Sequence, residues 1–121
     1  MNKHSILKDK TFRFGMLILD ISRILKHSGI DFDLQRQIRK SGTAVGALVA
    51  EAEYAQSKAD FINKLSIALK EANETRYWMT LLTGSHIIRD HSIEEADLLL
   101  TEIIKMLVAS IKTAKANSLK P

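Results

Sequence analysis

The spacing of the apolar residues constrains this chain more than any other feature of its sequence. In three long segments an apolar or small residue recurs at alternating intervals of four and three positions, a heptad pattern that keeps one face of an α-helix apolar. The positions that follow it are Leu34, Ile38, Ser41, Val45, Leu48, Ala52 and Ala55, then Phe61, Leu65, Ala68, Ala72, Thr75, Met79 and Leu82, and last Ala96, Leu100, Ile103, Leu107, Ser110 and Ala114. An earlier segment, from Phe14 to Leu25, has the same helical period. The pattern predicts four helices.

Helix-ending signals separate these four segments. The only proline is the last residue, and no run of residues alternates with period two, so we expect no strand. The expected boundaries are a stop near Ser28 and Gly29, a start capped by Asp33, a start at Ser57 with Asp60 three residues later, a stop near Gly84, and a start at Ser92 with Glu95 three residues later. Four helices with short connections predict an all-α fold, an antiparallel up-down-up-down four-helix bundle that forms one domain over residues 1–121.

Two glycines lie inside the second predicted helix. Gly42 and Gly46 are one turn apart, within an uncharged run from Ser41 to Ala50 that is far shorter than the ~20 apolar residues that span a bilayer. No strand precedes them and no lysine follows the second glycine, so they do not form a phosphate-binding loop. Glycine inside a helix costs ~1 kcal/mol relative to alanine. We interpret the pair as a place where a neighbouring helix approaches closely.

Several classes of function are disfavoured by what the sequence lacks. It contains no cysteine, which excludes disulfides, thiolate catalysis and sulfur-ligated zinc. Its start does not resemble a secretory signal, so we expect a cytoplasmic protein without a membrane segment. The di-iron sites of helix bundles use Glu-x-x-His pairs, and none occurs here. We expect no metal, no cofactor, no catalytic residue and no enzymatic activity. The histidines are scattered, at His4, His27, His86 and His91.

The aromatic residues of the middle segments are interpreted as packing residues. Tyr54, Tyr77 and Trp78 most simply belong to the core or to an interface. The alternative is an aromatic platform on which nucleic-acid bases stack.

Charge is distributed unevenly along the chain. Residues 1–40 carry nine Lys or Arg and four Asp or Glu, residues 41–104 carry five and ten, and residues 105–121 carry four Lys and no acid. In the predicted bundle the first helix starts beside the end of the fourth, which gives one basic cluster at each end. The candidate residues are Lys8, Lys10, Arg13, Lys112 and Lys115 at one end, and Arg36, Arg39 and Lys40 at the other. Such clusters bind RNA or DNA backbones by releasing counterions. Alternatively, they only keep the bundle soluble.

The fourth segment is more apolar than the outer helix of a monomeric bundle needs to be. Twelve of its residues between Ile93 and Ile111 are apolar, whereas about three in seven suffice for such a helix. An exposed excess would form a large apolar patch, which monomers rarely tolerate. We therefore expect a homo-oligomer with the fourth helix at the subunit contact. The alternative is that the bundle packs this helix centrally.

Residues 37 to 82, QIRKSGTAVGALVAEAEYAQSKADFINKLSIALKEANETRYWMTLL, resemble the 23S rRNA intervening-sequence protein family. The second helix of that family follows a pattern like Q-[IL]-R-[RK]-[SA], and its third helix a pattern like S-x-x-[DE]-F with a later E-T-x-Y-[WL]. The matching residues include Gln37, Ile38, Arg39, Lys40, Ser41, Ala50, Glu51, Ser57, Asp60, Phe61, Leu65, Ala68, Glu74, Thr75 and Trp78. The chain departs from the pattern at Gly46, where the family has Ser nearby, and at Ala47-Leu48, which replaces Asn-Ile.

The resemblance implies a bacterial, antiparallel four-helix bundle, commonly assembled as a ring-shaped pentamer. It implies no catalytic residues, and the molecular function of most members is unknown. Related bundle proteins bind nucleic acid. Together with the charge pattern, the resemblance leads us to expect a non-enzymatic homo-oligomer that binds RNA or DNA through its basic clusters. The alternative is a scaffold that binds a protein partner and no nucleic acid.

Overall fold

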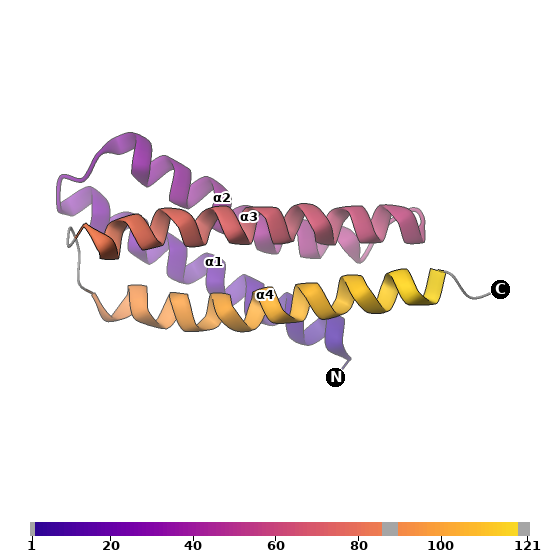
Figure 1. Cartoon of the computed structure of the whole chain (residues 1–121). Helices are drawn as coiled ribbons and strands as arrows, with labels where there is room; N and C mark the ends of the chain where they lie inside the picture. Colours follow the sequence, from indigo (N-terminus) through magenta and orange to yellow (C-terminus); the bar gives the residue numbers. More distant parts are fainter. Residues whose placement is uncertain (1, 86–89, 119–121) are drawn as a thin grey trace.

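Four α-helices make up the structure, a computed structural model that describes residues 2–85 and 90–118. They are α1 (Lys3–His27), α2 (Phe32–Ala52), α3 (Lys58–Gly84) and α4 (His91–Ser118). No strand occurs within the described ranges. Consecutive helices run in opposite directions (Figure 1), so the predicted all-α four-helix bundle is confirmed.

Each helix packs against two others, and the packed pairs are α1 with α2, α2 with α3, α3 with α4, and α4 with α1. Within the described residues α1 and α3 therefore lie diagonally across the bundle from each other. The pair α1 and α2 is inclined relative to the pair α3 and α4 (Figure 1). Both termini lie at the same end, where α1 begins, α4 ends and α2 connects to α3.

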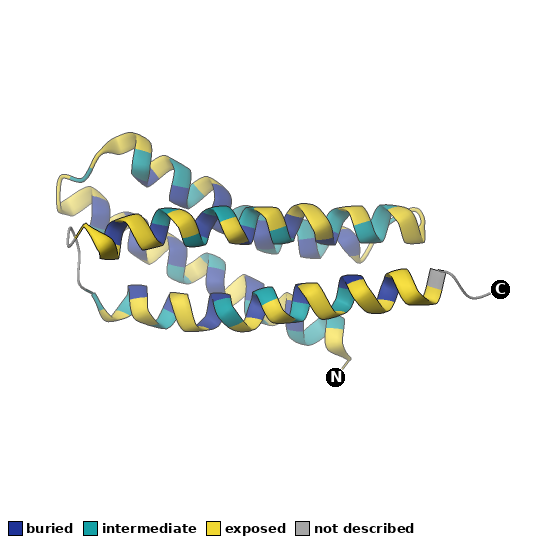
Figure 2. Ribbon diagram, viewed as in Figure 1, coloured by how far each residue is buried: buried dark blue, intermediate teal, exposed yellow. Residues whose placement is uncertain are grey.

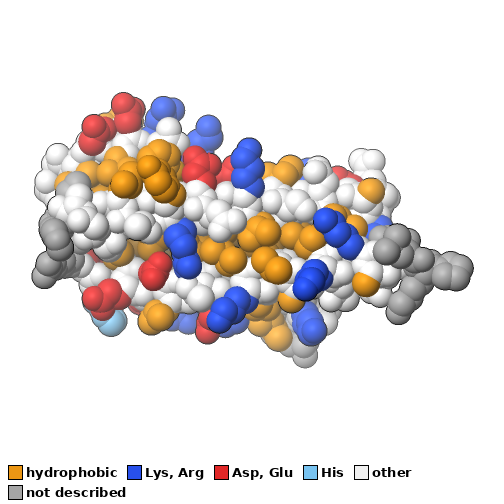
Figure 3. Space-filling view, in the orientation of Figure 1, with side chains coloured by type: hydrophobic (Ala, Val, Ile, Leu, Met, Phe, Trp, Pro, Cys, Tyr) orange, Lys and Arg blue, Asp and Glu red, His pale blue; other side chains and the backbone are white. Residues whose placement is uncertain are grey.

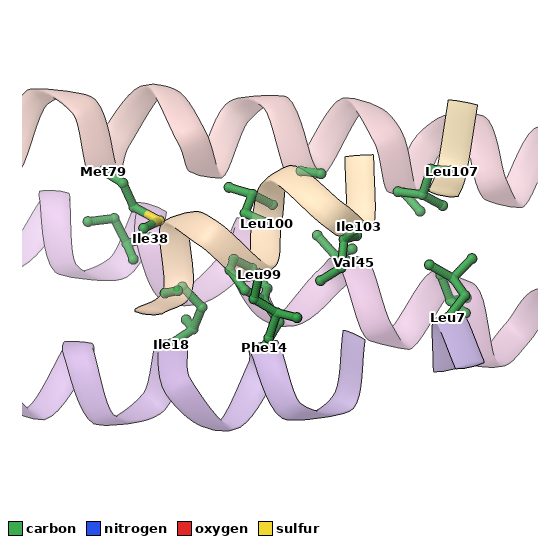
Figure 4. Close-up of a cluster of buried hydrophobic side chains, with 14 of the residues drawn as sticks. Leu7, Phe14, Ile18, Ile38, Val45, Met79, Leu99, Leu100, Ile103 and Leu107 are labelled. Carbon is green, nitrogen blue, oxygen red and sulfur yellow. The ribbon is translucent and has the colours of Figure 1, made fainter. Parts of the chain in front are cut away.

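The core runs along the axis of the bundle and contains most of the residues at the heptad positions. Buried residues form a stripe along the inner side of each helix (Figure 2). Phe14 of α1 lies next to Leu99 of α4, with Ile18 one turn further along α1, while Leu7 lies on the side of Leu107 (Figure 4). All of these side chains are at most 7% exposed. The four-three spacing therefore identified the inward faces correctly.

Two helix starts differ from the prediction for the same reason. The helix α2 is capped by Asp31, whose carboxylate accepts a hydrogen bond of 2.7 Å from the backbone N–H of Asp33. Before α4, the carboxylate of Asp90 accepts a bond of 2.8 Å from the N–H of Ser92. The predicted caps Asp33 and Ser92 are wrong because in both cases an aspartate two residues earlier satisfies the free N–H groups of the first turn.

The other boundaries confirm the prediction. Ser57 caps α3, where its hydroxyl accepts a bond of 3.0 Å from the N–H of Asp60. After α1, Gly29 adopts a φ of 69°, a left-handed conformation that favours glycine, and the N–H of Ile30 bonds back to the carbonyl of Leu25. The start of α1, for which we made no prediction, is capped by Asn2, whose side chain accepts a bond of 2.8 Å from the N–H of Ser5.

The close approach expected at the two glycines of α2 is confirmed, and the approaching helix is α1. A Cβ atom on Gly42 would lie 2.7 Å from Cγ1 of Ile18, and one on Gly46 would lie 3.1 Å from the backbone oxygen of Thr11. Both distances are shorter than an ordinary carbon contact. The missing side chains therefore let α1 lie directly on the backbone of α2.

The large exposed apolar patch expected on the fourth helix is not formed. Among its twelve apolar residues, the large ones that remain exposed are Leu98, at 72%, and Val108, at 43%. The others are buried or half-buried, apart from the small Ala109. The wide apolar stripe is covered because α4 packs against both α1 and α3. Most of the large exposed apolar side chains lie instead on α1 and α3.

We expect Gly42→Ala to lower the free energy of unfolding by up to about 2 kcal/mol. A methyl group there overlaps the fully buried Ile18, and overpacking costs about 1–3 kcal/mol, which outweighs the gain of ~1 kcal/mol in helix propensity. The matched control is Gly15→Ala in α1, where the added carbon meets nothing within 4 Å and should stabilise the protein. Urea denaturation of both variants checks this, and equal stabilisation by both would contradict the close packing of α1 on α2.

Candidate nucleic-acid interface

Three of the candidate basic residues on α1 form ion pairs within the bundle. Lys8 Nζ lies 2.7 Å from Oε2 of Glu53 after α2, and the other two residues pair with carboxylates of α4. The distances there are 3.0 Å from Lys10 Nζ to Glu102 Oε2 and 2.7 Å from Arg13 Nη2 to Glu95 Oε1. These cations therefore connect α1 to both of its neighbours, and a carboxylate balances the charge of each.

The predicted end cluster is thus split along α1. Arg13 lies ten residues beyond Lys3, about 15 Å along the helix, and it pairs with the first turns of α4 rather than with its last turns. Lys112 and Lys115 are exposed near the end of α4. Placing all five residues in one cluster overlooked the length of a helix of 25 residues.

The pairing of Lys8 and Glu53 shifts the pKa values of both groups. The hydrogen bond with Glu53, and then its negative charge, raise the pKa of Lys8 above its usual value. The same hydrogen bond and the positive charge of Lys8 lower the pKa of Glu53. Both side chains are over 40% exposed, so solvent screens the interaction.

A different set of lysines surrounds a pocket at the end of the bundle where α1 begins and α4 ends. The pocket has a volume of about 540 Å³ and is lined by residues of α1, α3 and α4. Lys3, Lys58 and Lys105 are part of its lining. None of the three forms an ion pair within residues 2–85 and 90–118. We call them the pocket lysines.

Lys112 lies seven residues beyond Lys105, on the same face of α4. Sequence reasoning missed the pocket lysines as a group because Lys58 belongs to the acidic middle of the chain. One sequence feature could have identified two of them. Lys3 and Lys58 each precede a helical pattern, so both lie in the first turn of helices that start at the same end of the bundle.

The second predicted cluster lies at the opposite end of the bundle, in the first half of α2. Arg36 and Lys40 are exposed, and neither forms an ion pair in the described part of the chain. Arg39 is half-buried, and its Nη1 donates a long bond of 3.5 Å to the hydroxyl of Ser22 on α1. Arg23, nearby on α1, is paired with Asp20. The structure therefore brings Arg36, Arg39 and Lys40 together, as predicted.

Basic and hydrophobic side chains are interspersed on the face formed by α3 and α4. Lys and Arg side chains lie around hydrophobic ones over much of this face, while Asp and Glu gather over the start of α4 (Figure 3). The aromatic residues Tyr77 and Trp78 pack edge to face, with ring centroids 5.3 Å apart. Tyr77 is 58% exposed and Tyr54 is 81% exposed, so neither is a core residue.

Residues that could bind a metal do not gather in the described ranges. No three His, Cys, Asp or Glu side chains there lie close enough together to hold an ion. His86 lies outside the described residues. Within the same ranges, none of the helices combines the length and the apolar character that a membrane crossing requires.

The fold and its charged ends define a small helical-bundle protein. The model of the 23S rRNA-intervening sequence protein family matches residues 3–109. The chain therefore belongs to this family, which confirms the resemblance of residues 37 to 82.

The chain is also similar to a protein of known structure. That protein, from the S23 ribosomal protein family of Bacteroides thetaiotaomicron, is described as having unknown function. It is 45% identical to this chain, the match covers 92% of this chain and 99% of the other, and the TM-score is 0.86. No curated protein gives a significant match.

Several residues that carry the family resemblance have structural roles here. Thr75 of α3 and Ser41 of α2 are buried, and their hydroxyl oxygens lie 2.8 Å apart in a hydrogen bond that joins the two helices. Thr75 donates in this bond, and the Ser41 hydroxyl donates in turn to the carbonyl of Gln37, at 2.9 Å. Gly46, where the chain departs from the family pattern, is one of the two glycines that lie against α1.

The pKa shifts predict how the contribution of the Lys8–Glu53 pair to the stability of the fold changes with pH. Because the pKa of Glu53 is lowered in the folded state, its contribution to stability is present above its unfolded pKa and is lost as pH falls through the folded pKa. Because the pKa of Lys8 is raised, its contribution is lost as pH rises through that value. We expect Glu53→Gln to lower the melting temperature slightly near neutral pH and not in acid.

The control for this prediction is Glu74→Gln, since Glu74 forms no ion pair in the described part of the chain. Melting curves of both variants and the parent, recorded from acid to alkaline pH at low salt, make the comparison. A difference between Glu53→Gln and the parent that persists in acid would contradict the assignment.

Proposed function

We propose that this protein is a non-enzymatic homo-oligomer that binds RNA or DNA through the basic residues at the two ends of its bundle. The observation that carries the proposal is that these ends hold exposed cations without carboxylate partners in the described ranges. They are Arg36 and Lys40 at one end, and the pocket lysines with Lys112 at the other. A cation without a carboxylate partner gives up no existing ion pair when it contacts a phosphate.

The names of the family and of the similar protein support the same proposal. One refers to an intervening sequence of 23S ribosomal RNA and the other to a ribosomal protein family. Both connect proteins of this fold with ribosomal RNA or its genes. The family resemblance also supports a cytoplasmic location.

Exposed apolar side chains on opposite sides of the bundle support assembly into an oligomer. Phe12, Met16 and Leu19 lie on the outer side of α1, with exposed fractions of 68%, 48% and 40%. Tyr77 and Leu81 lie one turn apart on α3, at 58% and 42%. Because α1 and α3 are diagonal in the bundle, one face of a subunit can contact the other face of the next. Head-to-tail contacts of this kind form rings where the rotation between subunits closes, as in the pentamer that the resemblance implies.

A scaffold that binds a protein partner is the alternative function. It is favoured by two exposed aromatic side chains near the ends of α2, Phe32 at 65% and Tyr54 at 81%. Aromatic residues are enriched at protein interfaces. Binding of a protein partner would respond weakly to salt, whereas phosphate contacts weaken steeply as salt increases.

We expect the protein to bind a structured RNA or a duplex DNA with an affinity that falls steeply as salt is raised. In the variant Arg36→Gln/Lys40→Gln/Lys112→Gln, the slope of log affinity against log salt should decrease by about one for each phosphate that the protein no longer neutralises. The matched control, Lys8→Gln/Lys10→Gln/Arg13→Gln, removes the same charge from paired positions and should change the slope less. Absence of binding at low salt, or equal effects of the two variants, would count against the proposal.

Single apolar-to-glutamate variants test the assembly. Met16→Glu on α1 and Tyr77→Glu on α3 should each reduce the assembly to the monomer mass of 13.6 kDa in analytical ultracentrifugation, while Leu98→Glu on α4 should not. Each of the first two variants keeps one intact face, so an equal mixture should form a heterodimer through the two intact faces. A monomeric parent protein, or a mixture that stays monomeric, would overturn the head-to-tail arrangement.

A further inference from the structure

We infer that the pocket between the start of α1, the start of α3 and the end of α4 binds one unpaired nucleotide, with the base inside and the phosphate at the pocket lysines. This inference rests on the proposed function and specifies which form of nucleic acid the protein prefers. The pocket volume of about 540 Å³ lies within the range of roughly 300–1,000 Å³ that is typical of small-molecule sites.

The cations around the pocket define the charge of its ligand. Lys3, Lys58 and Lys105 come from three different helices, and no carboxylate in the described part of the chain pairs with them. Lys3 and Lys58 are the first residues of α1 and α3, whose N-terminal ends carry partial positive charge. The end of α4 carries the opposite partial charge. The full charges of the three lysines therefore determine the electrostatic potential at the opening of the pocket. Three unpaired cations around one opening select an anion.

Part of the pocket lining is apolar and aromatic. Phe61 of α3 and Met106, Ala109 and Ala114 of α4 are among its lining residues. The imidazole of His4 packs on Phe61, with ring centroids 5.9 Å apart and the planes inclined by 48°. A planar base can bury its faces against such a surface, and the stacking of a base on an aromatic side chain does not depend on which base it is.

Three hydrogen-bonding side chains of α4 also line the pocket. Ser110, Thr113 and Asn117 follow a spacing of three and four on α4 and therefore share one face. None of their side chains forms a hydrogen bond within the described residues. Thr113 is the exception among the threonines, because the hydroxyls of the other six, Thr11, Thr43, Thr75, Thr80, Thr83 and Thr101, bond back to a carbonyl of their own helix.

These three groups distinguish a nucleotide from a simpler anion with an apolar tail. A fatty acid would satisfy the lysines and the apolar lining residues, but its chain would also cover Ser110, Thr113 and Asn117 and leave them unbonded, which costs free energy. A base, in contrast, offers donors and acceptors along its edge that can bond to these three side chains. The Nε2 atom of His4, another lining residue, is buried without a partner among the described residues.

In a duplex the bases are stacked and paired, and only an unpaired base can enter a pocket. The inference therefore predicts a preference for single-stranded segments. The full-length protein should bind an RNA hairpin with an unpaired loop more tightly than a fully paired duplex of equal charge, by about tenfold or more, as expected for the stacking of one base.

The variant that tests this is Ala109→Trp, which fills the pocket while all of its lysines remain. We expect its affinity for the hairpin to fall to that for the duplex, with duplex binding unchanged within about twofold. The control is Val108→Trp, an exposed position on another side of α4 that does not line the pocket, and it should behave as the parent. Hairpin binding by Ala109→Trp that equals that of the parent would overturn the inference.

A second measurement does not depend on a large substitution. Adenosine monophosphate added to the labelled parent protein should shift the amide NMR signals of residues around the pocket, and the conservative variant Thr113→Val should weaken this binding several-fold. Decanoate that binds at the same place while the nucleotide does not would overturn the inference in favour of a fatty acid. If duplex and hairpin bind equally, only the inference fails, whereas binding of neither at low salt removes the proposed function itself.

Discussion

The direct contact of α1 with the backbone of α2 is the constraint on which the rest of the structure depends. Ile18 is fully buried against Gly42, and the carbonyl of Thr11 lies over Gly46. Two contacts on one face fix both the distance and the register of the helices. The register in turn places Lys8 opposite Glu53. This closely packed pair is inclined relative to α3 and α4 (Figure 1).

The basic residues of the chain have two different roles that their number alone does not reveal. Lys8, Lys10 and Arg13 join α1 to its neighbours, and the carboxylates they contact come from the acidic middle of the sequence and from α4. The uneven distribution of charge along the chain is therefore partly a consequence of which helices lie side by side. Only the cations that remain after this pairing are available to a ligand.

The number of helices, their inward faces and the close approach at the glycines could be predicted, because each depends on spacing within one helix. The starts of α2 and α4 could not be fixed to the residue, since Asp31 and Asp33, and likewise Asp90 and Ser92, can all serve as caps. The candidate site was predictable at Arg36, Arg39 and Lys40, which lie on one segment. The pocket was not, because it requires the register of three helices that are far apart in sequence.

The cap at the start of α1 has a consequence beyond the helix itself. The ends of helices open more readily than their middles, and the first turn of α1 carries Lys3 and His4, which form one wall of the pocket. The bond from the N–H of Ser5 to the side chain of Asn2 keeps that turn wound. Asn2 does not line the pocket. It nevertheless governs the fraction of molecules in which the pocket has its full shape, because it controls the fraying of this single helical turn.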